Sequence, residues 1–209
     1  MRKATLHPIL LLASIAFLVG NIGATTDRDN LRCLSIRGSF APDTQVDLPR
    51  NIIGVWEMVR PEGSIALSKA PLLRCLGRGA EFASVYSYSL TDTPVPRWNW
   101  AAYGRTFQVD GELYLVRQLL ALSIECKTLS HVDYSAGQLS ERNIPLASIQ
   151  RSLEAAKLAY STKNSSLVVE ASDLVELLRG PDSSLLSVRP SIWVRPETVG
   201  VETCPAAVK

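Results

Sequence analysis

Polar and apolar residues alternate along the chain from residue 52 to about residue 134. A period of two is typical of β-strands with one buried face, so this region predicts a run of antiparallel strands. Segment 84–90, SVYSYSL, alternates in this way, and the prolines of segment 91–96, TDTPVP, predict a turn or loop after it. Segments 166–170 (SLVVE) and 192–194 (IWV) predict two further strands.

The clearest strand signal, segment 103–118 (YGRTFQVDGELYLVRQ), predicts a β-hairpin. Its Asp110-Gly111 pair suits a type I′ turn, in which both central residues need positive φ. That turn would place Phe107 opposite Tyr114, Val109 opposite Glu112 and Arg105 opposite Val116. One face of the hairpin is then aromatic and aliphatic, with polar ends.

Helical spacing begins after Pro145, which a helix tolerates in its first turn. Apolar residues recur there at steps of three and four, at Leu146, Ile149, Leu153, Ala156 and Tyr160. They predict one main helix near 145–162. A short second helix is predicted near 174–179, capped by Asp173 and stopped by Gly180-Pro181. The expected fold class is α+β, mainly antiparallel β, in a single β-rich domain with a helical C-terminal part.

The N-terminal residues 1–24 have the three parts of a secretory signal peptide. Arg2 and Lys3 precede an apolar run of 12 residues, Ile9 to Gly20, and small residues follow near Ala24. A membrane-spanning helix needs roughly 20 apolar residues, so we expect cleavage near Ala24, with retention as an anchor as the alternative. No second run of that length follows, so no stable membrane span is expected in the mature domain, 25–209.

Cleavage also changes the charge of the chain. The sequence has 22 Lys and Arg and 20 Asp and Glu, and removal of Arg2 and Lys3 leaves the mature chain formally neutral. A neutral chain lacks the basic surface that binds nucleic acid or an anionic membrane, so neither partner is expected.

Four cysteines, Cys33, Cys75, Cys126 and Cys204, remain after cleavage. An even number of cysteines in an exported chain predicts two disulfides, in any of three pairings. No Cys-x-x-Cys occurs, so neither a zinc ribbon nor a thioredoxin-type site is indicated. Together with the signal peptide, these cysteines predict a secreted or periplasmic protein.

Candidate catalytic groups are few. Cys126 as nucleophile with His131 as base is the most enzyme-like pair, but a disulfide at Cys126 and a commonplace His-x-Asp sequence explain the same residues. The common serine motifs, a dinucleotide-binding loop, a calcium loop and a histidine-rich metal site are all absent. We therefore expect no enzyme, no cofactor and no metal.

Aromatic residues give the stronger functional signal. Trp98 and Trp100 alternate onto one face of a strand, and with Phe107 and Tyr114 they could line a pocket for a small ligand. The alternative is that both tryptophans belong to the core, as large aromatic residues usually do.

Segment 51–60, NIIGVWEMVR, resembles the Gly-x-Trp strand that opens lipocalins and related calycins. Val132-Asp133-Tyr134 is similar to a second lipocalin motif, and the helix after Pro145 resembles the one that packs outside their barrel. The resemblance implies an eight-stranded barrel, structural roles for Gly54 and Trp56, and an apolar ligand held inside.

Two functions follow as hypotheses. The first is an exported, non-enzymatic protein that binds a small apolar or aromatic ligand in a cavity of roughly 300 Å³ or more. The second is an envelope or secreted protein-interaction module, such as an enzyme inhibitor or immunity factor. It predicts a filled core and an exposed apolar patch that binds a protein partner.

Overall fold

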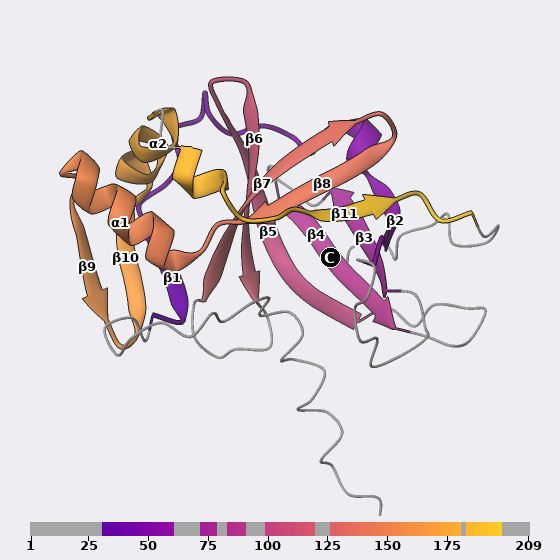
Figure 1. The fold of residues 1–209 in the computed structure, drawn as a ribbon, viewed down its shortest axis with the longest axis horizontal. Helices are drawn as coiled ribbons and strands as arrows, with labels where there is room; N and C mark the ends of the chain where they lie inside the picture. Colours follow the sequence, from indigo (N-terminus) through magenta and orange to yellow (C-terminus); the bar gives the residue numbers. More distant parts are fainter. Residues whose placement is uncertain are drawn as a thin grey trace, which may run out of the picture. The chain divides into compact units, whose positions relative to one another are not determined.

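The structure is a computed structural model that describes residues 31–60, 72–78, 83–90, 99–119, 126–180 and 183–197. All of these residues belong to one compact unit, Leu31–Lys209. Figure 1 shows its strands and helices. The strands are β1 (Cys33–Arg37), β2 (Gly54–Met58), β3 (Leu72–Arg78), β4 (Ala83–Leu90), β5 (Asn99–Val109), β6 (Glu112–Leu119), β7 (Lys127–Ser135), β8 (Gln138–Asn143), β9 (Tyr160–Lys163), β10 (Ser166–Glu170) and β11 (Ser191–Val194).

The helices are α1 (Leu146–Ala156) and α2 (Ala171–Arg179), with 3-10 turns η3 (Arg50–Ile52) and η4 (Ser183–Leu186). The predicted α+β class and its mainly antiparallel sheet are confirmed. Within the described ranges, neither helix is long and apolar enough to cross a membrane.

The main helix is shorter than predicted. It ends at Ala156 because Lys157 adopts the left-handed conformation, with φ 56° and ψ 32°, and its amide donates to the carbonyls of Leu153 and Glu154. Tyr160, predicted to continue the helical stripe, instead begins β9. The second helix begins earlier than predicted, at Ala171, so Asp173 lies in its first turn and is not its cap.

Strand pairing produces one mixed sheet with the order β6-β5-β4-β3-β2-β11-β8-β7-β1-β10-β9. The pairing of β1 with β10 is parallel, and the other pairings are antiparallel. The sheet as a whole is not closed into a barrel, because β1, β10 and β9 extend from β7 to an edge at β9.

Eight of the strands nevertheless pair in a ring, because β6 also pairs with β7 along six residues. Successive neighbours run from β2 through β3, β4, β5, β6, β7, β8 and β11 back to β2. We call this set the eight-strand ring. The remaining strands and both helices lie outside it, on the side of β7 (Figure 1).

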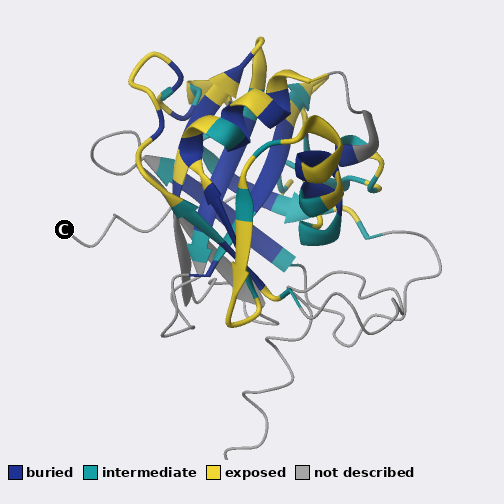
Figure 2. Ribbon diagram, turned by 90° about the vertical axis from the view of Figure 1, so that its left-hand side faces the viewer, coloured by how far each residue is buried: buried dark blue, intermediate teal, exposed yellow. Residues whose placement is uncertain are grey.

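The eight-strand ring has an inner and an outer face, because side chains alternate along each strand. The inner face contributes a cluster that contains Trp56, Leu115, Leu139 and Trp193 and no residue of α1 or α2. The outer face of β5, β6 and β7 packs with both helices and with β1 and β10 in a second, larger cluster. Figure 2 shows the buried residues along the strands and exposed residues on the outer turns of the helices.

The Gly-x-Trp segment begins the ring, and Arg195 holds it. The Arg195 guanidinium donates hydrogen bonds to the carbonyls of Asn51 and Ile53, at 2.9 Å each. It also stacks over the indole of Trp56, with 3.9 Å from Cζ to the ring centroid. Trp56 is fully buried. This contact ties the residue after β11 to the start of β2.

Gly54 is required at this place for two reasons. Its φ is +124°, where side chains cause backbone strain, and a Cβ would collide with the Arg195 guanidinium. We expect Gly54→Ala to lower the free energy of unfolding by about 2–3 kcal/mol, measured by urea denaturation. Gly137→Ala is the matched control, because Gly137 has φ +79° but open space at its Cβ. Equal losses in the two variants would show that the Arg195 contact contributes nothing.

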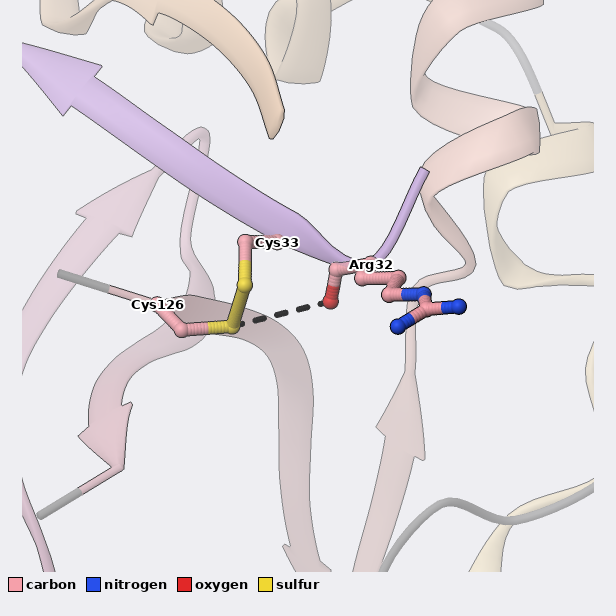
Figure 3. Close-up of a disulfide and its surroundings, with 3 residues drawn as sticks. All are labelled: Arg32, Cys33 and Cys126. Carbon is pink, nitrogen blue, oxygen red and sulfur yellow. Dashed lines mark hydrogen bonds between the residues drawn. A yellow bond between two sulfur atoms is a disulfide. The ribbon is translucent and has the colours of Figure 1, made fainter. Parts of the chain in front are cut away.

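A disulfide joins Cys33, at the start of β1, to Cys126, just before β7 (Figure 3). The Sγ of Cys126 also lies 3.6 Å from the carbonyl oxygen of Arg32. Cys75 is disulfide-bonded as well, and among the described residues no cysteine is free. The fourth cysteine, Cys204, lies outside the described residues. Of the two predicted disulfides, the Cys33–Cys126 bridge is thus confirmed, and Cys75 takes part in disulfide bonding.

Candidate functional site

The residues predicted for a site form two sets, the catalytic pair Cys126 and His131 and a set of four aromatic residues. Cys126 is bonded to Cys33, so it has no thiol to act as a nucleophile with His131. Phe107 and Tyr114 pair across β5 and β6 as the hairpin signal predicts, and both are buried. Trp100 lies in β5 with its side chain outside the described atoms, and Trp98 lies outside the described residues.

A row of rings crosses the outer face of the sheet. Phe107 on β5, Tyr114 on β6, His131 on β7 and Arg142 on β8 occupy successive register positions. The ring centroids are 5.5 Å apart for Phe107 and Tyr114, and 5.4 Å apart for Tyr114 and His131. Phe40 also stacks on Phe107, with 4.4 Å between the ring centroids. We call Phe107, Tyr114 and His131 the aromatic row.

The aromatic row begins in the core and ends in a cleft of about 580 Å³. Phe107 is 0 % exposed and belongs to the cluster beneath the helices. Tyr114 and His131 line the cleft from the sheet side, and the end of α2 with η4 forms the opposite wall. That wall is apolar at Leu178, Leu185 and Leu186.

Charged residues surround the rings of the cleft. Asp110 and Glu112 come from the β5–β6 turn, Asp133 from β7, Arg142 from β8 and Arg179 from the end of α2. The register of Leu113 with Val132 brings Glu112 and Asp133 beside each other on the outer face. Carboxylates placed side by side in this way repel each other.

His131 is held at the bottom of the cleft by one carboxylate. Its Nε2 lies 2.6 Å from Glu112 Oε2, and the side chain of Glu112 is 59 % exposed while that of His131 is 5 % exposed. The other ring nitrogen, Nδ1, is buried and has no hydrogen-bond partner among the described residues. Burial raises the pKa of Tyr114, and the negative charges of Glu112 and Asp110 raise this pKa further. The phenol therefore stays neutral well beyond pH 7.

Most of the other charges of the cleft have no ion-pair partner among the described residues. In the part of the chain that the structure describes, no ion pair within 4.0 Å involves Asp110, Asp133 or Arg142. Arg179 has an exposed partner, Glu176, at 3.6 Å. No group of three His, Cys, Asp or Glu among the described residues could hold a metal ion. The cleft is thus suited to a small molecule with its own charges.

A second, smaller cavity of about 270 Å³ adjoins the same carboxylates. Glu112 and Asp133 line both cavities, and Asp47, Ile52 and Tyr134 line the smaller one. This cavity lies where the segment before β2 passes the β5–β6 turn.

The inner face of the ring contains a buried ion-pair network that the sequence analysis did not predict. Glu141 on β8 contacts Arg74 on β3 and Arg117 on β6, although neither strand is its neighbour in the sheet. Arg117 also donates to Asn143 and Ser130, at 2.7 and 2.8 Å. The signal in the sequence was one charged residue in each of three strands. Which side of these strands points inward could not be assigned before the ring was known.

Glu112 and Arg142 were likewise not predicted as members of the site. The hairpin register could have placed Glu112 beside Tyr114 on one face, but the cleft needs β7, β8 and α2 as well. No family model, no curated protein and no solved structure matches this chain, so the chemistry of the cleft is inferred from its own residues.

Proposed function

We propose that the protein is an exported, non-enzymatic binding protein that holds a small ligand with an aromatic or apolar body in the cleft beside α2. The observation that carries this proposal is the aromatic row, which runs from the core to the cleft and presents Tyr114 and His131 there. Rings fixed by stacking bind a flat ligand with little further loss of conformational entropy.

The cleft has the size and lining of a small-molecule site. Its volume of about 580 Å³ falls in the range of about 300–1,000 Å³ that such sites occupy. Apolar walls at Val109, Leu178 and Leu185 would bury the body of the ligand, and the surrounding charges would orient its polar groups. Export is supported by the predicted signal peptide and by the Cys33–Cys126 disulfide.

The lipocalin resemblance stays a hypothesis and implies a different place for the ligand. A ring of eight antiparallel strands that begins at Gly54-x-Trp56 supports the resemblance. The described inner face, however, carries Arg74, Arg117 and Glu141, and burying an apolar ligand against charged groups is unfavourable. The cleft is therefore the site that we propose.

The alternative function, a protein-interaction module, predicts an exposed apolar patch. Among the described residues, Val59 is the one large hydrophobic side chain that is exposed, at 45 %. A single exposed valine does not make such a patch, so the ligand-binding function has priority.

Ligand-observed NMR with indole and p-cresol tests the proposal on the mature protein. We expect Leu186→Trp to weaken probe binding at least tenfold, because Leu186 is a half-buried wall residue of the cleft. Leu158→Trp is the matched control: Leu158 is half-buried against the same core cluster but does not line the cleft, and its binding should stay within twofold.

Equal affinities in the two tryptophan variants would overturn the cleft as the site. Native mass spectrometry of the protein purified from its own host separates the two functions. A co-purifying small mass supports the proposal, and a stoichiometric protein partner supports the alternative.

A further inference from the structure

The acidic and the basic residues of the cleft come from different elements. The acidic groups Asp110, Glu112 and Asp133 belong to the β5–β6 turn and to β7. The basic groups Arg142 and Arg179 belong to β8 and to the end of α2. The cleft therefore has a negative end and a positive end, with Tyr114 and His131 between them.

The distance between these ends follows from the sheet. Glu112 lies on β6 and Arg142 on β8, with β7 between them. Neighbouring strands are about 4.8 Å apart, and the two residues are also offset along the strands, so their backbones are separated by roughly 10–12 Å. The ammonium and carboxylate of a single amino acid share one carbon, which is too short to reach both ends. An extended tripeptide, at about 3.3 Å per residue, spans that distance.

One group at each end, Asp133 and Arg142, has no ion-pair partner within 4.0 Å among the described residues, whereas Glu112 contacts His131 and Arg179 contacts Glu176. Glu112 and Asp133 lie side by side, and an ammonium group between them would remove their repulsion. The half-buried Arg142 has no carboxylate within 4.0 Å among the described residues, and its planar guanidinium suits a carboxylate. Between the ends, Tyr114, His131 and the apolar wall at Leu186 line the cleft and mark the place of a side chain.

We infer that the ligand of this cleft is a short zwitterionic peptide of about three residues with a central aromatic side chain. Its N-terminal ammonium lies between Glu112 and Asp133, and its C-terminal carboxylate pairs with Arg142. The aromatic side chain packs between the aromatic row and Leu186. This inference rests on the proposed function and adds the chemical class of the ligand.

Isothermal titration calorimetry with Gly-Tyr-Gly tests the inference on the mature, disulfide-bonded protein. We expect N-acetylation and C-amidation each to weaken binding at least fivefold, and high salt to weaken binding of the free peptide because its end contacts are partly exposed. In Arg142→Gln, amidation should have no further effect. In Asp133→Asn, the effect of acetylation should shrink. Arg151→Gln, on the exposed side of α1, is the matched control and should bind like the wild type.

The outcomes separate the inference from the proposed function. Equal affinity for free and doubly blocked peptide overturns the zwitterion while leaving an aromatic ligand site in place. An amidation effect that persists in Arg142→Gln overturns the assignment of the carboxylate. Absence of peptide binding in a protein that still binds p-cresol overturns the inference alone, whereas loss of both in the wild type overturns the proposed function.

Discussion

Glu141→Gln is expected to lower the free energy of unfolding by about 3–5 kcal/mol, because the change removes one partner of a buried ion pair. Glu141 is 3 % exposed and contacts the guanidinium groups of Arg74 and Arg117 inside the eight-strand ring. Glutamine keeps the shape of the side chain but carries no charge, so both buried cations lose this carboxylate. Urea denaturation at pH 7 measures the loss.

The control for this variant is Glu197→Gln, which removes an exposed carboxylate after β11 and should change stability by less than about 0.5 kcal/mol. A loss below about 1 kcal/mol in Glu141→Gln would contradict the assigned role. It would mean that the interior reorganises around the two arginines without this carboxylate.

The comparison of wild type with Glu141→Gln also predicts how stability depends on pH. Burial acts to raise the pKa of Glu141, but the charges of Arg117 and Arg74 and hydrogen bonds from Arg74 and Ser130 outweigh it and lower this pKa from 4.5 to about 2. Because the folded pKa is depressed, the stabilisation is complete above pH 4.5 and is lost as the pH falls toward 2. The difference corresponds to about 3 kcal/mol. Wild type should therefore lose its advantage over Glu141→Gln across this window.

Removing the Cys33–Cys126 disulfide with the double change to alanine is expected to lower the free energy of unfolding by about 2–5 kcal/mol. The bridge joins residues 93 positions apart, and an open chain of that length has far more conformations to lose on folding. In the folded state β1 pairs with β7 at Leu34 and Lys127 only, so the bridge is a principal link between them.

Urea denaturation and amide hydrogen exchange of the double variant measure this effect. Exchange should accelerate first in β1 and β10, which pair in parallel over five residues. Reduction of the wild-type protein with a thiol is a poorer test, because the reductant would also break the disulfide of Cys75. An unchanged midpoint and unchanged exchange in β1 would show that pairing with β10 alone holds this strand.

Local signals in the sequence predicted local structure well. The β5–β6 register is confirmed because Asp110 and Gly111 fix it by themselves, with φ values of 49° and 88°. The main helix was predicted to extend too far, because it ends where Lys157 adopts the left-handed conformation. Lysine rarely adopts that conformation, so the residue type did not indicate a helix end. Strand β9 was not predicted, because Tyr160 at its start continues the helical spacing.

Contacts between distant segments could not be predicted. The ring depends on β11 pairing with both β2 and β8, and nothing in the sequence of residues 191–194 specifies either partner. The cleft likewise needs Arg142 beside His131 and α2 opposite both. Of the four residues predicted to bind a ligand, Tyr114 lines the cleft and Phe107 supports it from the core.

The position of β11 determines the order in which the molecule can be completed. β11 lies between β2 and β8, and its residues are made about 130 positions after those of β2. While the chain is synthesised from its amino end, β2 and β8 therefore each keep an open edge until residues 191–194 have been made. Open strand edges recruit other chains. The eight-strand ring can therefore close only once residues 191–194 have been made.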